Sequence, residues 1–487
     1  MPACRCCAWL FACLLLPAQA LAASLGLLVP VFEEGAPLQR PGPDGQPAPV
    51  VAELREGGLH AQLQREAREG FTARMLALDE QAQRLAGATD PRPTWLYLSV
   101  EEGGFARSGF WLREGESERF VDEAFVDLVV DGNSITDGSF EEIFAHELGH
   151  VFLRRLLPGL PQGHSRTPHH GYSLTDYPTA FDEGFAIHFQ LLARRLTANP
   201  RLREIDHGFD TRPFLPHWQS HRDRSQRIDG VRRNLFVHAQ LPLEGEGDAL
   251  ARERLSMAFS ATRLRNGQQM LSSEGVLATL FHRWIGPVPA PGLDAAYRPW
   301  FEAFRALDGR PLAPDSPLPV LLLRELHAIA PEAGARAIAT FIDTTYGLSE
   351  DAGLQAPAET LAMAGALGDI EGFVAGLGPA RQALAAVREA AQADPSRLGS
   401  ALGPAIWLLA DGEGGPAVNL NIAGSAELQA LGLSADEATR LLSARRQGGP
   451  FRDLAGACTR AGLVPDTAER LAARADAMAA AGRHARR

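Results

Sequence analysis

The strongest constraint on the fold is a long helical pattern that begins at Ser139 and extends to about residue 397 of this 487-residue sequence. Apolar residues recur there every three or four positions, which is the spacing of amphipathic helices. Clusters of Pro and Gly near residues 158–178, 286–293 and 311–318 interrupt the pattern and predict loops. We therefore predict a mostly helical α+β protein, with a small sheet before Ser139.

The predicted sheet rests on three short runs of apolar, β-branched and aromatic residues at 95–100, 110–112 and 125–130, with glycine turns between them. Residues 41–49 predict a loop, and residues 51–85 predict one or two surface helices. The chain then divides into a signal peptide (1–22), an N-terminal helix and small β-sheet region (23–138), a helical domain (139–310), a helical extension (311–410), a Gly-rich linker (411–416) and a small C-terminal domain (417–487).

The N-terminal residues have the pattern of an export signal. Arg5 precedes an apolar run, and the small residues Ala20 and Ala22 predict cleavage after Ala22. The alternative is an uncleaved anchor, because residues 25–32 are apolar again, but Pro17 and Pro30 interrupt that span. No later segment is long and apolar enough to cross a membrane. We therefore expect a periplasmic or extracellular protein with no stable membrane insertion after cleavage.

Composition limits the function classes. The net charge of −12 excludes a uniformly cationic surface for nucleic acid or anionic lipid. All 47 basic residues are arginine in a chain rich in Ala, Gly and Pro, which we interpret as the mark of a GC-rich bacterial genome. Four of the five cysteines lie in the predicted signal, so Cys458 alone remains and the mature chain has no intramolecular disulfide.

Residues 146–150 read His-Glu-Leu-Gly-His, the HExxH pattern, inside a predicted helix. Ser139 and Glu142 have the spacing of a capping box at the start of this helix. Residues four apart share a helix face, so His146 and His150 can bind one metal ion, with Glu147 beside them for proton transfer. The alternative is a helix whose histidines are ordinary surface or core groups.

Glu183 is the predicted third ligand. It lies in a second predicted helix, whose start is marked by Pro178 and Thr179. Two histidines and one glutamate suit Zn²⁺ and leave a fourth position for water, as in catalytic zinc sites. We therefore predict one zinc ion held by His146, His150 and Glu183.

The run Asp182-Glu183-Gly184-Phe185-Ala186, placed after HExxH, resembles the gluzincin zinc metallopeptidases. The resemblance covers about residues 90–300. It implies a hydrolase that cleaves peptide or protein substrates, with Glu147 as general base. Asp182 is predicted either to hydrogen-bond a ligand histidine through the ring nitrogen that does not bind the metal, or to cap its own helix.

The sequence departs from this family in three places. The Gly-x-Met-Glu-Asn signature of the aminopeptidases is absent, so the resemblance does not support an exopeptidase. Ser272 stands where the family has a catalytic tyrosine, which leaves the oxyanion stabiliser open among Tyr172, Tyr177, His188 and Tyr346. The stretch between the two motifs is longer than in the aminopeptidases, and its histidines, His164, His169 and His170, are predicted to lie in a surface loop.

Residues 417–480 resemble the helix-hairpin-helix domain of competence-type DNA-binding proteins. Gly432 and Gly462 match the first glycine of each hairpin, whereas Ser434 and Val464 replace the second. Residues 417–487 carry ten arginines and seven acidic residues, for a net charge of +3. Binding of double-stranded DNA, docking of a protein partner and a purely structural role all remain open, and Arg445 and Arg446 are the candidate DNA contacts beside the two hairpin glycines.

Together these patterns predict an exported zinc metallopeptidase with a small sheet, a helical catalytic domain, a helical extension and a helix-hairpin-helix domain. The rival prediction is a non-catalytic binding protein in which the C-terminal domain carries the function.

Overall fold

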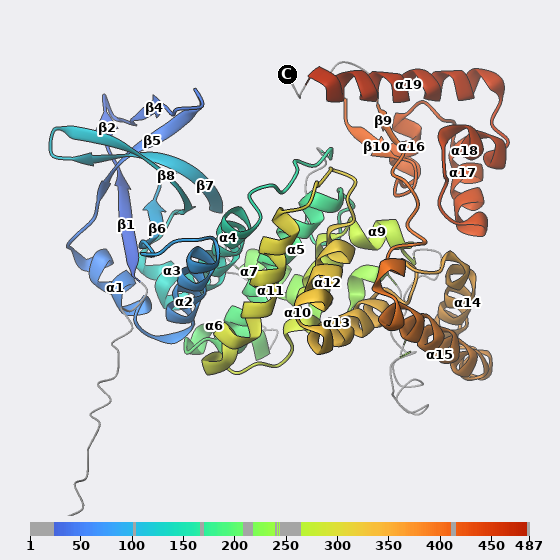
Figure 1. Cartoon of the computed structure of the whole chain (residues 1–487), viewed down its shortest axis with the longest axis horizontal. Coiled ribbons are helices and arrows are strands. Elements are labelled where there is room, and N and C mark those ends of the chain that lie inside the picture. The colour runs from blue at the N-terminus through green and yellow to red at the C-terminus, as the bar shows by residue number, and fades with distance from the viewer. Residues whose placement is uncertain are drawn as a thin grey trace, which may run out of the picture.

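The structure is a computed structural model that describes residues 24–100, 104–165, 170–207, 218–238, 241, 243, 264–410 and 415–484. It is mostly helical, with a small β-sheet near the N-terminus, and this confirms the predicted fold class. Figure 1 shows the sheet at one end of the molecule, the helices in the middle and the C-terminal helices at the other end. None of the described helices is both long enough and apolar enough to cross a membrane.

The N-terminal sheet contains six strands in the order β1-β6-β8-β7-β5-β4. Strand β1 pairs with β5 as well as with β6, so five of the strands close into a ring and β4 adds to its outside through β5. The strands are β1 (Leu25–Pro30), β4 (Gln39–Pro41), β5 (Pro47–Glu53), β6 (Thr94–Leu98), β7 (Gly104–Glu114) and β8 (Ser117–Leu128), and a separate small hairpin is formed by β2 (Phe32–Glu33) and β3 (Ala36–Pro37).

The sheet begins earlier than the sequence predicted. Residues 41–49 were expected to form a loop, but part of this segment forms the ends of β4 and β5. Pro47 and Pro49 lie only where β5 pairs with the short edge strand β4. Proline removes a backbone donor, which an edge pairing tolerates. The valines that follow make the pairings with β7 and β1.

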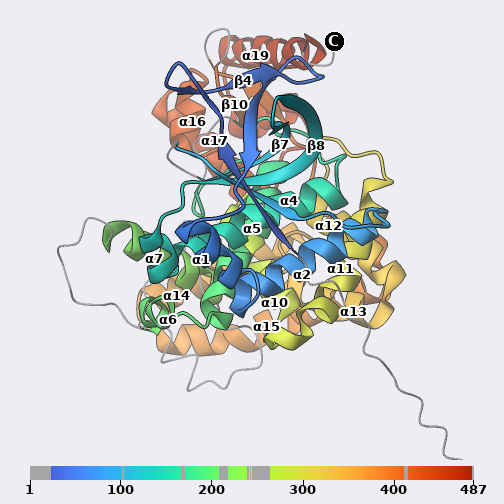
Figure 2. The same ribbon diagram turned by 90° about the vertical axis from the view of Figure 1, so that its left-hand side faces the viewer.

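The two faces of the sheet are buried in different cores. Leu96 and Val126 pack toward the helices, whereas their strand neighbours Tyr97 and Phe125 belong to a small aromatic core on the opposite face. This alternation follows from the two-residue period of a strand. Helices α1 (Gly58–Glu66) and α2 (Gly70–Leu85) lie below the sheet in Figure 2, beside the helical body.

The helical body is built around α4 and α5, with α5 also packed on α10 and α4 packed on α2 and β8. A cluster of phenylalanines forms its core, among them Phe152, Phe185 and Phe281. The helices are α3 (Gly132–Asp137), α4 (Ser139–Leu156), α5 (Tyr177–Leu196), α6 (Pro200–His207), α7 (Trp218–Arg232), α9 (Gly267–Leu271), α10 (Glu274–Ile285), α11 (Leu293–Asp308), α12 (Leu318–Ile329), α13 (Pro331–Thr344), α14 (Gln355–Ala366) and α15 (Ile370–Ala393).

The C-terminal module, residues 406–484 as described, has its own hydrophobic core. It consists of β9 (Trp407–Leu409), β10 (Ala417–Asn419), α16 (Ser425–Ala430), α17 (Ala435–Gly448), α18 (Leu454–Ala461) and α19 (Pro465–His484). Residues 411–416 were predicted to link two domains. This prediction is wrong, because β9 and β10 on either side of the segment pair with each other. The segment is the connection of a hairpin inside the module, and residues 411–414 lie outside the described residues.

Candidate metal centre

His146, Glu147 and His150 lie on α4, as the sequence predicted. The start of this helix differs from the prediction in one detail: Gly138, with φ of 83°, precedes the helix, and Ser139 is its first residue. The Ser139 amide donates to the Asp137 side chain at 2.8 Å, so the expected capping box of Ser139 and Glu142 does not form. Gly138 takes the cap position because it must turn the chain between α3 and α4 in a left-handed conformation.

Glu183 lies on α5, and its helix also begins slightly earlier than predicted. Asp176 caps α5 by accepting a hydrogen bond from the Thr179 amide at 2.9 Å. Pro178 therefore occupies the first turn, where its missing amide proton costs nothing.

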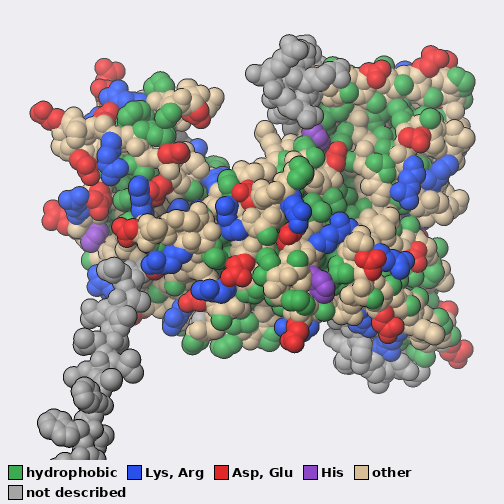
Figure 3. All heavy atoms as spheres, viewed as in Figure 1, with side chains coloured by type: hydrophobic (Ala, Val, Ile, Leu, Met, Phe, Trp, Pro, Cys, Tyr) green, Lys and Arg blue, Asp and Glu red, His purple; other side chains and the backbone are tan. Residues whose placement is uncertain are grey.

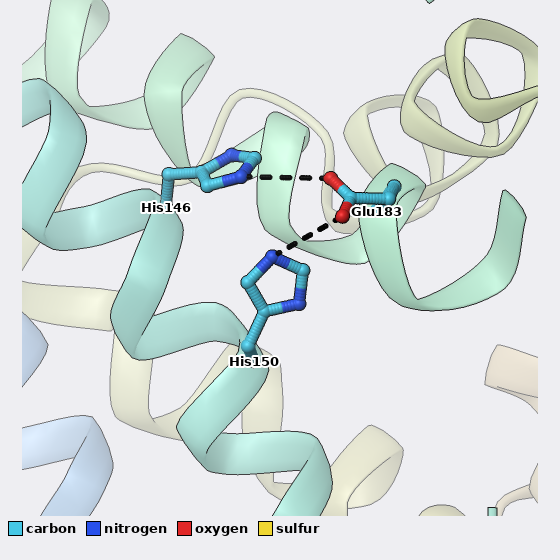
Figure 4. A group of neighbouring side chains, drawn as sticks. All are labelled: His146, His150 and Glu183. Atoms are coloured by element: carbon cyan, nitrogen blue, oxygen red, sulfur yellow. Dashed lines mark ion pairs between the residues drawn. The ribbon is translucent and has the colours of Figure 1, made fainter. Parts of the chain in front are cut away.

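The three predicted ligands converge on one point. One ligand atom from each of His146, His150 and Glu183 lies within 4.8 Å of the other two. The Nε2 atoms of His146 and His150 are 3.6 and 3.8 Å from the two carboxylate oxygens of Glu183. Figure 4 shows both rings pointing from α4 toward the Glu183 carboxylate on α5.

Two glycines allow these helices to come close. A Cβ on Gly149 would lie 3.0 Å from the Cα of Ala186, and a Cβ on Gly184 would lie 2.3 Å from the Cβ of Leu277. Gly149 thus brings α4 against α5, and Gly184 brings α5 against α10. Both lie beside a predicted ligand in sequence, so the close packing fixes the ligand positions.

Asp182 holds His150 from the side away from Glu183. The Nδ1 atom of His150 donates to Oδ1 of Asp182 at 2.6 Å, because a carboxylate only accepts. This leaves Nε2 of His150 to face Glu183. Of the two predicted roles for Asp182, the structure shows the contact with the histidine, while Asp176 caps the helix.

The centre is strongly anionic. Burial disfavours the charged form of His150, but the nearby carboxylates of Asp182, Glu183 and Glu147 outweigh it and raise the pKa of the imidazole to about 9. A field that holds a proton on a buried imidazole also favours a divalent cation at the same place.

Glu147 points toward the ligands from the same helix, with its Oε1 atom 4.0 Å from Nε2 of His146. Burial raises the pKa of its carboxyl to about 7, with His150 acting in the opposite direction. The first residue of β7, Gly104, lies against it: a Cβ there would be 2.8 Å from Oε1 of Glu147. The sheet therefore forms one wall beside this carboxyl.

Two further charged residues near the centre were not singled out by the sequence. Glu274 at the start of α10 is buried, and burial together with the charge of Glu183 raises its pKa to about 8. Arg154 lies one turn beyond His150 on α4 and interacts electrostatically with Glu147 and Asp182. Arg154 follows His150 by four residues, and this helical spacing predicts that the two side chains are neighbours on one helix face.

The other candidate residues lie elsewhere among the described residues. Nε2 of His188 contacts the Tyr297 hydroxyl at 2.6 Å, and the hydroxyl of Tyr346 accepts from the Leu241 amide at 3.0 Å. Tyr172 packs on Phe236, and Tyr177 and Ser272 are buried in the body. His164 packs on Trp407 and His170 is exposed, while His169 lies outside the described residues.

The C-terminal module does not present the predicted DNA contacts as expected. Arg445 is 8% exposed and donates to the Leu420 carbonyl at 2.7 Å, so tertiary packing covers most of this predicted DNA contact. Arg446 remains partly exposed and pairs with Glu359 at 3.6 Å. Gly432 and Gly462 have φ of 86° and 59°, which is the conformation that hairpin glycines supply.

At the start of α17 and of α19, one backbone position cannot donate to a phosphate. Glu437 accepts from the Ser434 amide at 2.9 Å and from the Thr467 hydroxyl at 2.7 Å. These bonds lower the pKa of Glu437 to about 2, so an anion already sits at the start of α17. At the second hairpin α19 begins with Pro465, which has no amide proton. Acidic and basic side chains are also intermixed over the face shown in Figure 3.

Comparison of the chain with models of known protein families, with curated proteins and with solved structures gave no match.

Proposed function

We propose that the protein is an exported zinc-dependent metallopeptidase that hydrolyses peptide bonds, with Glu147 as general base. One observation carries the proposal: His146, His150 and Glu183 bring three ligand atoms within 4.8 Å of one another, with the Glu147 carboxyl beside them.

Zinc is the metal that this donor set fits best. Two imidazoles and one carboxylate are ligands of catalytic zinc sites, which keep a further position for water or substrate. Asp182 supports the fit, because histidine ligands donate their other ring proton to a carboxylate. When bound, zinc supplies a Lewis acid and lowers the pKa of a coordinated water toward about 7.

The side chains of the protein move the proton and fix the geometry. Glu147 takes a proton from the attacking water and returns it to the leaving amine, which requires a carboxyl that is easily protonated and deprotonated near neutral pH. Burial raises the pKa of the Glu147 carboxyl to about 7, which meets this requirement. Asp182 fixes the tautomer and the ring orientation of His150.

Strand β7 supports a peptide as the substrate. Its first residues pair with β8 on one side, whereas β5 pairs with β7 only further along, at Trp111 and Leu112. Among the described strands, the beginning of β7 next to Glu147 therefore has an open edge. An extended peptide can pair with such an edge and present its backbone to the centre.

The test combines metal analysis of the purified protein with hydrolysis of a mixed peptide library, with and without a chelator. We expect about one zinc per chain and cleavage that the chelator abolishes. Glu147→Gln should retain zinc and lose cleavage by at least about a hundredfold, and His146→Ala should lose the metal. His60→Ala, a histidine on α1 outside the centre, is the control and should retain both.

Cleavage by Glu147→Gln would contradict the mechanism. Stoichiometric zinc without any cleavage by the wild type would favour the rival function, a binding protein that uses the C-terminal module. The export proposal is checked separately by mass spectrometry of the mature protein, which should begin at Ala23.

A further inference from the structure

A cleft of about 850 Å³ lies between the helical body and the C-terminal module. Arg265 and Asn266, which precede α9, and Gln355 on α14 line it from the body. Ser425 and Arg445 line it from the module. The metal ligands are not among its lining residues, so the cleft is a second site, of the size that holds a small organic ligand.

Arg265 is a buried cation on the body side of this cleft. Its side chain is 4% exposed and donates to the Ser273 hydroxyl and the Tyr172 carbonyl. Both acceptors are neutral, and no carboxylate of the described residues forms an ion pair with it. Burial lowers the pKa of the guanidinium to about 10, because no nearby carboxylate offsets the cost of burying its positive charge.

Arg445 is a second such cation, on the module side. It is 8% exposed, and its one described hydrogen bond goes to the Leu420 carbonyl at 2.7 Å. Burial, and then the neighbouring charge of Arg446, lowers its pKa to about 10, against a weaker effect of Glu427. It too forms no ion pair within the described part of the chain.

Arginine is almost never fully buried without a counter-charge. Here two arginines from separate parts of the fold line one cleft, and neither forms an ion pair with a described carboxylate. We propose that this cleft binds a small ligand that carries phosphate or carboxylate groups and that neutralises Arg265 and Arg445.

The rest of the lining limits the ligand to a few negative charges. Glu359 and Glu427 also line the cleft, together with Arg446, so the positive excess is small. This disfavours a polyanion such as DNA in the cleft. The hydroxyl of Ser425 and the amides of Asn266 and Gln355 provide neutral hydrogen-bonding groups for the remainder of a small molecule.

The ligand class is tested by isothermal titration of the full-length mature protein with glycerol phosphate and with glutarate at constant ionic strength. We expect one saturable site for at least one probe, with a Kd below about 1 mM. The probe that binds identifies phosphate or carboxylate as the preferred group. Binding should persist in His146→Ala, which separates this site from the metal centre.

Variants on the two walls make the test specific. Arg445→Gln should weaken binding about tenfold, since it removes the charge. Arg440→Gln is the matched control on the same helix; its guanidinium bonds to the Ala461 carbonyl, and its affinity should be unchanged. Glu359→Gln removes a negative charge from the lining and should strengthen binding about threefold, a gain that misfolding does not produce.

Three results would overturn the proposal. These are no saturable binding of either probe up to about 10 mM, well above the expected Kd; equal affinities in wild type, Arg445→Gln and Glu359→Gln; and binding of a short duplex DNA without binding of either small anion.

Discussion

His188 gives the clearest pH dependence at the level of a single residue. It is fully buried among aromatic rings, with Nδ1 directed at the Phe185 carbonyl and Nε2 at the Tyr297 hydroxyl. The neutral ring satisfies both contacts by donating from Nδ1 and accepting at Nε2. Burial lowers the pKa of this imidazole to about 3.

Because the unfolded chain takes up this proton near pH 6.5, it binds more protons than the native state between about pH 6.5 and 3. His188 therefore contributes stability that is present above pH 6.5 and is lost as the pH falls, by up to about 1.4 kcal/mol per pH unit. We expect His188→Gln to lose less stability than the wild type between pH 6.5 and 4 in urea unfolding. Tyr297→Phe keeps the imidazole, so its free energy of unfolding should change with pH as steeply as that of the wild type. If the free energies of the wild type and of His188→Gln change equally with pH, His188 is not the source of this pH dependence.

Single residues also show which properties a sequence pattern predicts and which it misses. The spacing of His146 and His150 is local to one helix, and the structure brings both together with Glu183. The burial of Arg445 is a tertiary property, because the group that accepts its hydrogen bond, the Leu420 carbonyl, comes from outside its helix. A sequence pattern on one helix does not contain that information.

At the level of elements, the pairing of α5 with α10 depends on Gly184. A Cβ there would lie 2.3 Å from the Cβ of Leu277 and 2.9 Å from the Glu274 carbonyl. Backbone atoms of a packed helix cannot move aside without displacing the helix. Since Glu183 precedes this glycine, Gly184→Ala should shift the predicted ligand, weaken zinc binding at least about tenfold and destabilise the fold by about 1–3 kcal/mol.

Chelator competition measures the zinc affinity and thermal unfolding measures the stability of this variant. Gly378→Ala is the matched control, because Gly378 lies inside α15 and an added Cβ meets nothing within 4 Å. Alanine has the higher helix propensity, so this control should be neutral or slightly stabilising. If Gly184→Ala binds zinc like the wild type, the close packing does not fix the ligand.

The sequence did not predict strands β1 and β5, and both omissions have the same physical cause. The described helices after Ser139 carry their periodicity locally. The strand runs predicted at 95–100, 110–112 and 125–130 overlap β6, β7 and β8, although the bounds of these strands differ from the prediction. Strands β1 and β5 were not predicted, because β1 follows the apolar export segment and β5 begins with Pro47 and Pro49. Their partners lie far away in sequence, and long-range pairing overrides the local signal.

At the level of the whole molecule, the C-terminal module is tied to the body rather than tethered by a linker. Gln268 on α9 donates to the carbonyls of Gly403 and Pro404 at 3.2 and 3.1 Å, and its side-chain oxygen accepts from Asn419 at 3.3 Å. The glycine-rich composition of 411–416 predicted a linker because it indicates local freedom of the chain. It does not show that β9 and β10 pair with each other across this segment, or that Asn419 of β10 contacts Gln268 of α9, which is distant in sequence.

Gln268 therefore couples the stability of the module to that of the body. Gln268→Met keeps the length of the side chain but leaves buried acceptors without a donor, which should cost about 1–3 kcal/mol. We expect hydrogen exchange to speed up in β10, although the substitution lies on α9. Gln429→Met is the control, because this exposed side chain on α16 bonds, among the described residues, to Ser425 alone. Unchanged exchange in β10 of Gln268→Met would show that the body does not stabilise the module through this residue.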